Sequence, residues 1–157
     1  MIHRIEIATR RGLRDARGEH VARKVKGFLD ISLTSVRTRD VYHVEADLTA
    51  TEMAQVVHEF ADPVLQVGQV GRVEDGPFDI GIRVAYKPGV ADPVGKSAKV
   101  AIRDTLGRDL GEEAAVYTSV LYLLEGVDRQ QGERIAFELL ANPVIQTLRS
   151  PAGARCR

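Results

Sequence analysis

The chain has 157 residues, with 22 basic and 22 acidic side chains and therefore no formal net charge near neutral pH. This balance is not typical of nucleic-acid-binding domains, which carry a strongly basic surface. Apolar residues make up 44% of the sequence, but no apolar run approaches the roughly 18 residues of a membrane span, so we expect a soluble, cytoplasmic protein.

The first half of the sequence predicts the order strand, helix, strand, helix, strand. Asp15 is placed to cap the first helix, and the capping box Thr49-Ala50-Thr51-Glu52 opens the second. A strand is expected around Ile5 and Ile7, followed by a helix with Val21, Val25, Phe28 and Leu29 on its apolar face and a β region over Ser32–Asp47. The second helix should turn Met53, Val56, Val57 and Phe60 inward and end at Asp62-Pro63. A strand over Val64–Val70 completes this half.

The second half predicts the same order. Phe78–Tyr86 alternates apolar and polar residues, as a half-buried strand does. Asp92 stands at an N-cap and Pro93 at the first helical position, where its missing N–H costs nothing. This helix is expected to reach about Leu106, and Ala114–Glu125 is expected to form either one bent strand or two strands that meet near Ser119. A second helix, opened by Asp128 and Gln131, should turn Ile135, Ala136, Leu139 and Leu140 inward. It should stop at Asn142-Pro143 and be followed by a strand over Val144–Leu148.

Two short segments of the first half recur in the second. Gly12–Gly18 returns as Gly89–Gly95, and Ala61–Gln66 returns as Ala141–Gln146, at offsets of 77 and 80 residues. The same alignment sets Thr38 against Thr118 and Tyr42 against Tyr122. Recurrence in one order indicates a duplicated domain. We therefore predict two repeats at residues 1–72 and 78–149, a linker at 73–77 and a tail at 150–157.

The element order predicts an α+β fold of two tandem β-α-β(β)-α-β repeats, packed as a pseudo-twofold fused dimer with antiparallel sheets. A repeat of about 75 residues would be marginal alone, so each half is expected to bury apolar surface on the other. Residues 120–124 are apolar on both faces of their strand. We therefore expect the sheet of one repeat to pack on the sheet of the other repeat, or on another chain.

A search for reactive groups finds no catalytic constellation. Gly89–Ser97 looks in part like a phosphate-binding loop, but five residues separate its glycines where the pattern has four. Asp92 and Pro93 also oppose phosphate at the helix start, because one adds a negative charge and the other removes an N–H donor. The four histidines lack metal-ligand spacing, and Cys156 is the only cysteine. We expect no catalytic residues, no metal and no cofactor.

Other residues are candidates for structural or interface roles. A glycine in the first turn of a helix weakens that helix by up to about 1 kcal/mol relative to alanine, so Gly18 and Gly95 indicate a close backbone approach, either to the sheet or to a partner chain. The tyrosines of the repeats form either packing contacts or an interface. Arg10, Arg11, Arg14 and Arg17 form either a solvated loop or a contact for an acidic partner. The candidate motif and interface residues are Gly18, Asp92, Pro93, Gly95, Tyr42, Tyr122, Asn142 and Pro143.

Two motifs resemble a known family. Lys87-Pro88-Gly89-Val90-Ala91-Asp92-Pro93-Val94-Gly95 and Glu138-Leu139-Leu140-Ala141-Asn142-Pro143-Val144-Ile145 resemble the PurS-type small subunit, or N-terminal PurS-like domain, of phosphoribosylformylglycinamidine synthase. The second repeat matches best, from about Phe78 to Arg149. In the first repeat Ala16 replaces the proline and Asp62 replaces the asparagine, so the resemblance implies a tandem pair whose halves differ.

The resemblance implies a division of labour in a purine-biosynthesis enzyme that uses ATP and glutamine. A large subunit binds ATP and the ribonucleotide, a glutaminase subunit releases ammonia, and PurS-type dimers hold the two together. The chain would then be a non-catalytic bridging component with the synthetase and glutaminase subunits or domains as partners, and its self-association stays open. One alternative is an ACT-like regulatory module that binds a small molecule, since that fold has the same element order. Another is an autonomous small ligase, for which the sequence lacks a nucleotide motif.

Overall fold

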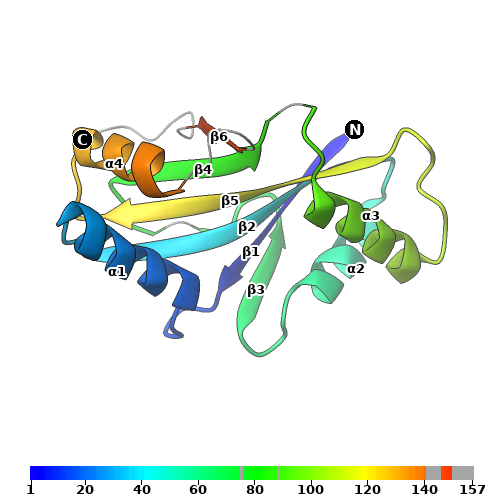
Figure 1. Cartoon of the computed structure of the whole chain (residues 1–157). Helices are drawn as coiled ribbons and strands as arrows, with labels where there is room; N and C mark the ends of the chain where they lie inside the picture. The colour runs from blue at the N-terminus through cyan, green and yellow to red at the C-terminus, as the bar shows by residue number, and fades with distance from the viewer. Residues whose placement is uncertain (75, 88, 141–145, 150–157) are drawn as a thin grey trace. The chain divides into compact units, whose positions relative to one another are not determined.

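The computed structural model describes residues 1–74, 76–87, 89–140 and 146–149 (Figure 1). Both halves of the sequence show the order β-α-β-α-β, which confirms the α+β fold class, and the central β stretch of the second half is one strand. The elements are β1 (Ile2–Thr9), α1 (Ala16–Leu29), β2 (Ser35–Glu45), α2 (Ala50–Phe60), β3 (Gln66–Val70), β4 (Ile80–Tyr86), α3 (Pro93–Leu106), β5 (Ala115–Glu125), α4 (Arg129–Ile135) with a π-helical turn (Ala136–Leu140), and β6 (Gln146–Arg149).

The chain divides into two compact units, and each unit takes segments from both halves of the sequence. Unit 1 contains Met1–Arg11, Asp40–Val73 and Ala91–Ser119. Unit 2 contains Gly12–Arg39 and the described residues from Glu74 to Val90 and from Val120 onward. β2 and β5 each contribute one stretch to each unit. The repeats at 1–72 and 78–149 remain a prediction about the sequence, since neither unit coincides with either of them.

Unit 1 has the strand order β3-β1-β2-β5, with α2 and α3 packed on one face. β1 and β3 are antiparallel, from Ile5 opposite Val70 to Thr9 opposite Gln66. Alternate residues of β1 point to the helices, as the period of two in a strand requires. The buried core of unit 1 is Ile5, Ile7, Val44, Ala46, Leu48, Met53, Val56, Ala98, Ile102, Ala114 and Val116.

Unit 2 has the strand order β2-β5-β4-β6, with α1 and α4 packed on one face. β4 and β6 are antiparallel, and Val84 lies opposite Leu148. Its buried core is Val21, Val25, Ile31, Val36, Ile82, Val84, Leu124, Val127, Ile135 and Ala136. Each unit therefore has a core of its own, and each core contains one helix from the first half of the sequence and one from the second.

The helix ends follow the sequence signals. Thr49 and Glu52 form a reciprocal capping box at α2, and Asp128 and Gln131 form one at α4. α3 begins at Pro93 and ends at Leu106. Its C-cap is Gly107, whose φ of 65° is the left-handed conformation that glycine adopts without steric cost. These caps satisfy backbone donors and acceptors that each helix leaves unpaired at its ends.

The sheets of the two halves do not pack face to face as expected, and packing on another chain stays a prediction. Strands of the two halves are instead neighbours in the same sheet order, because β2 lies beside β5. In unit 2, Arg37 and Arg39 lie on the face of β2 opposite Val36 and donate hydrogen bonds to the segment that joins β3 to β4. Arg37 donates to the carbonyl of Pro77 at 2.6 Å, and the buried Arg39 donates to the carbonyl of Glu74 at 2.8 Å. That segment therefore contacts both of these side chains.

Two further expectations are corrected at the ends of elements. β3 begins at Gln66, since Val64 and Leu65 belong to the loop before it, where the Asp62 carboxylate accepts both of their N–H groups. Phe28 does not face the core: its side chain is 73% exposed. The buried stripe of α1 runs through Gly18, Val21 and Val25, and Phe28 lies at the edge of this stripe in the last turn.

In unit 1 an arginine from the loop after α3 is bound to the first turn of α2. Arg108 Nε and Nη2 donate to the two carboxylate oxygens of Glu52 at 2.8 and 3.0 Å, and Nη2 also donates to the carbonyl of Asp47. The hydrogen bond from Arg108, followed by that from the Thr49 N–H, lowers the pKa of Glu52 from 4.5 to about 2. The forked geometry of this pair is the favourable arrangement for arginine and carboxylate.

The Glu52 carboxylate predicts a measurable acid dependence of stability. Because its pKa is lower in the folded chain, ionised Glu52 stabilises the fold above pH 4.5, and this contribution is lost as the pH falls toward about 2. Glu52→Gln should therefore flatten the pH dependence of the unfolding free energy within this window, as measured by urea denaturation followed by circular dichroism.

Arg108→Gln is the matched variant for this measurement. It should remove the larger part of the same dependence, because the hydrogen bond from Arg108 is the main cause of the shift and the Thr49 N–H stays in place. The double variant should add little to Glu52→Gln, since both changes remove one pair. Parallel curves for Glu52→Gln and the unmodified chain between pH 4.5 and 2 would contradict the assignment.

Candidate functional site

The Asp-Pro-x-Gly motif forms an anchor between a helix and a strand in unit 1. Asp92 Oδ1 accepts the N–H of Gly95 at 2.8 Å, which caps α3. Asp92 Oδ2 accepts the N–H of Thr118 in β5 at 2.7 Å, and the Thr118 hydroxyl donates to the same carboxylate at 2.9 Å. One carboxylate thus ties the first turn of α3 to β5.

Gly95 allows α3 to lie directly against the backbone of β5. A Cβ atom at this position would clash with the carbonyl oxygen of Val116. The close approach that the sequence indicates is therefore made to the sheet of unit 1. Pro93 is the first residue of α3, where it fixes the backbone angle without removing a helical hydrogen bond.

The same arrangement occurs in unit 2 at the start of α1. Asp15 Oδ1 accepts the N–H of Gly18 at 2.9 Å, and Asp15 Oδ2 accepts the N–H of Thr38 at 2.7 Å. The buried Thr38 hydroxyl donates to Asp15 at 2.9 Å, and a Cβ atom on Gly18 would clash with the carbonyl oxygen of Val36. Asp15 and the two threonines were not among the candidate residues, although the alignment of Thr38 with Thr118 pointed to this correspondence.

The other candidate residues lie apart from these anchors or outside the described part of the chain. Tyr42 packs in the core of unit 1, with its ring 5.0 Å from that of Phe60 at an interplanar angle of 58°. Tyr122 is half-buried against the core of unit 2. Asn142 and Pro143 lie outside the described residues. Each tyrosine thus has a packing environment within its own unit, and an interface role for either remains a prediction.

The arginines before α1 and in its first turn make contacts within the chain. Arg14 forms a forked pair with Glu19, which raises the pKa of Arg14 and lowers that of Glu19. Arg17 Nε donates to the Thr38 hydroxyl at 3.0 Å, and Arg10 donates to the carbonyl of Pro63 at 3.0 Å. The arginines of this cluster therefore have partners in the fold, and the charge of Arg14 is balanced by Glu19.

The anchors position backbone and do not assemble reactive groups. The Asp92 carboxylate occupies the start of α3, where a phosphate would have to bind, so the segment 89–97 does not have the geometry of a phosphate loop. Within the described ranges, no three His, Cys, Asp or Glu side chains are grouped so that they could hold a metal ion. Among these residues there is also no helix that is long and apolar enough to cross a membrane.

The glycines of α1 provide a matched test of the close approach. Gly18→Ala should destabilise the chain by about 1–3 kcal/mol, because the added methyl group forces the helix away from the Val36 carbonyl. Gly27→Ala, in the same helix, should stabilise it by up to about 1 kcal/mol, because nothing lies within 4 Å of its Cβ position. Urea unfolding of both variants measures the difference, and equal effects would contradict the packing described.

The comparisons with known proteins address the second half of the chain. The family model PurS, described as phosphoribosylformylglycinamidine (FGAM) synthase, matches residues 79–151. A search among curated proteins finds no match to the chain. The matched stretch runs from β4 through β6 and includes the whole Asp92–Thr118 anchor. The tandem duplication stays a prediction, because the match does not extend to the first half. The match of residues 79–151 supports a PurS-like domain in the second half of the sequence.

Proposed function

We propose that the chain is a non-catalytic bridging component of phosphoribosylformylglycinamidine synthase in purine biosynthesis. It would hold the ATP-dependent synthetase and glutaminase parts of the enzyme together, so that ammonia released by one reaches the other. The observation that carries the proposal is the match of residues 79–151 to the PurS family. The family's description names the enzyme, and the partners and the bridging role are part of the proposal.

The contacts that the motif residues make within the fold support this role. In both units the carboxylate of the motif is engaged by a helix N–H, a strand N–H and a threonine hydroxyl. Asp15 and Asp92 therefore stiffen the backbone in the places where a nucleotide-binding protein would present donors to phosphate. A rigid arrangement of this kind suits a component that positions other subunits, because little conformational entropy is lost when it binds.

A bridging role has a distinct kinetic consequence. Joining two catalytic parts raises the local concentration of one at the other to the millimolar range, even when each contact is weak. Free ammonia does not need this proximity, since it reaches the synthetase from solution. The chain should therefore matter for the reaction that starts from glutamine and much less for the one that starts from added ammonia.

Reconstitution with purified synthetase and glutaminase components tests the proposal. Omitting the full chain should lower glutamine-dependent product formation by at least about tenfold, because the effective concentration supplied by the bridge is lost. Ammonia-dependent activity should change by less than about twofold. The Gly27→Ala variant, which alters no described contact, should restore glutamine-dependent activity as the unmodified chain does.

Binding to both components is a second requirement. The immobilised full chain should retain both the synthetase component and the glutaminase component. The two can be added one at a time or together, in which case a ternary complex forms. Failure to retain either component, or equal loss of glutamine-dependent and ammonia-dependent activity on omission of the chain, would refute the bridging role.

A further inference from the structure

Two phenylalanines lie on the outer side of the helices of unit 2. Phe28, in the last turn of α1, is 73% exposed, and Phe137, in the π-helical turn after α4, is 71% exposed. The chain has only four phenylalanines. Aromatic side chains are enriched at the centres of protein interfaces, and exposing two of them to water is unfavourable unless something covers them.

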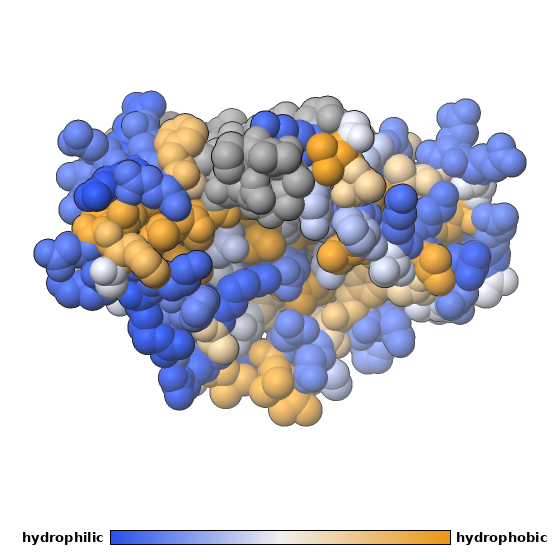
Figure 2. Space-filling view, viewed as in Figure 1, coloured by the Kyte–Doolittle hydropathy of each residue, from blue (hydrophilic) through white to orange (hydrophobic). Residues whose placement is uncertain are grey.

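Both phenylalanines are exposed on helical segments that pack against the same core of unit 2. α1 and α4 contribute to the same core and cover the same side of the sheet. Figure 2 shows apolar surface over these two helices, bordered by hydrophilic side chains. The aliphatic residues of the face that are only partly buried are Ala22, Leu29, Leu139 and Leu140. We call this surface, with Phe28 and Phe137, the two-phenylalanine face.

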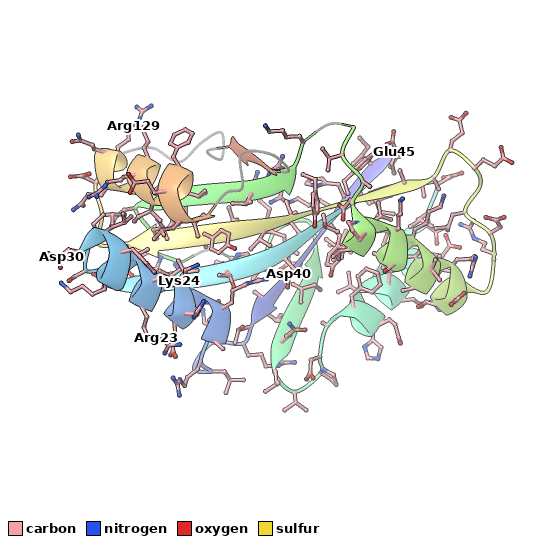
Figure 3. All side chains as sticks on the ribbon, viewed as in Figure 1. Arg23, Lys24, Asp30, Asp40, Glu45 and Arg129 are labelled. Atoms are coloured by element: carbon pink, nitrogen blue, oxygen red, sulfur yellow. The ribbon has the colours of Figure 1, made fainter. Side chains whose placement is uncertain are left out.

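The α1 side of the face is cationic. α1 contains four basic residues and one acidic residue, Glu19, which is paired with Arg14. Arg23 and Lys24 are exposed and project from the outer side of the helix (Figure 3). In the part of the chain that the structure describes, no salt bridge is formed by either of them. The face therefore combines apolar anchors with a positive edge.

The helices of unit 1 lack this combination. Phe60 of α2 packs against Tyr42 and is only partly exposed. Across α2 and α3 together, basic and acidic residues balance, three of each. The exposed aromatic pair on the helices is thus specific to unit 2, although both units use the same helix anchor.

We infer that the two-phenylalanine face docks an acidic protein surface with an apolar pocket, on another component of the synthase. The inference rests on the proposed function, and it assigns the contact surface on this chain. A second copy of the chain is disfavoured as the occupant, because a twofold contact through this face would bring Arg23 and Lys24 against their own copies. A nucleic acid is disfavoured because the chain has 22 basic and 22 acidic side chains and so lacks the strong positive charge of nucleic-acid-binding domains.

Affinity measurements on full-length variants test the docking face. Phe28→Ala combined with Phe137→Ala should weaken binding to the synthetase or the glutaminase component by at least about tenfold, as the loss of central aromatic anchors does. Arg23→Glu combined with Lys24→Glu should weaken the same interaction by at least about threefold and reduce its dependence on salt. Biolayer interferometry against each purified component gives both values.

Matched controls come from exposed residues of unit 1. Val64→Ala removes another strongly exposed apolar side chain (72%), and Arg72→Glu reverses another exposed charge. Both should bind within about twofold of the unmodified chain. Thermal unfolding of every variant checks that it is folded, which is expected because all the changed side chains are exposed.

The outcomes separate this inference from the proposed function. If the unmodified chain binds neither component, the bridging role fails. If it binds and the double phenylalanine variant binds equally well, the docking face is wrong while the bridging role stands. If sedimentation shows a homodimer that is lost when both phenylalanines are changed, the inference is overturned in favour of a second copy. If a single-stranded oligonucleotide binds and its binding depends on both phenylalanines, the inference is overturned in favour of a nucleic acid.

Discussion

The carboxylates of Asp15 and Asp92 each join the first turn of a helix to a strand of the same unit. Each accepts a helix N–H, a strand N–H and a threonine hydroxyl, so it satisfies donors that would otherwise be left at the helix start and in the strand. Gly18 and Gly95 then let the helix backbone come close to the strand carbonyl. The buried faces of α1 and α3 can reach their cores only at this separation.

The two anchors hold elements of different cores. The first fixes α1 in unit 2 beside β2, and the second fixes α3 in unit 1 beside β5. Both central strands run through both units, since β2 and β5 each contribute one stretch to each. Each unit is therefore packed in the same way, while the helix surfaces differ. The helices of unit 2 expose Phe28 and Phe137, whereas Phe60 on α2 of unit 1 is only partly exposed.

Much of this could be predicted from local sequence. The capping residues Asp92, Thr49 and Asp128 act through neighbours three residues away, so their signals lie within a few positions of the sequence. The sheet arrangement could not be predicted in the same way. Apolar residues on both faces of β5 show that both faces are covered but not what covers them, and the sheet order depends on long-range pairing between β2 and β5.

Phe28 illustrates the other limit of sequence reasoning. Its spacing from Val21 and Val25 fits an inward-facing helical position, yet it lies beyond the edge of the buried stripe. A periodic pattern cannot distinguish a residue that completes a core from one that extends the apolar stripe onto the surface. Disagreement of this kind between a local pattern and the observed burial tends to occur where a residue serves something other than the fold.

The composition of the two cores also bears on how the protein is made. Unit 1 requires α3 and the first part of β5, and unit 2 requires the second part of β5 and α4. As the nascent chain leaves the ribosome, α1 and β1 emerge first, but neither core can close until β5 has followed them. The N-terminal half must therefore wait in an incompletely packed state during synthesis, and this delay exposes its apolar strands to chaperones and to aggregation for longer than in a protein whose domains fold one after the other.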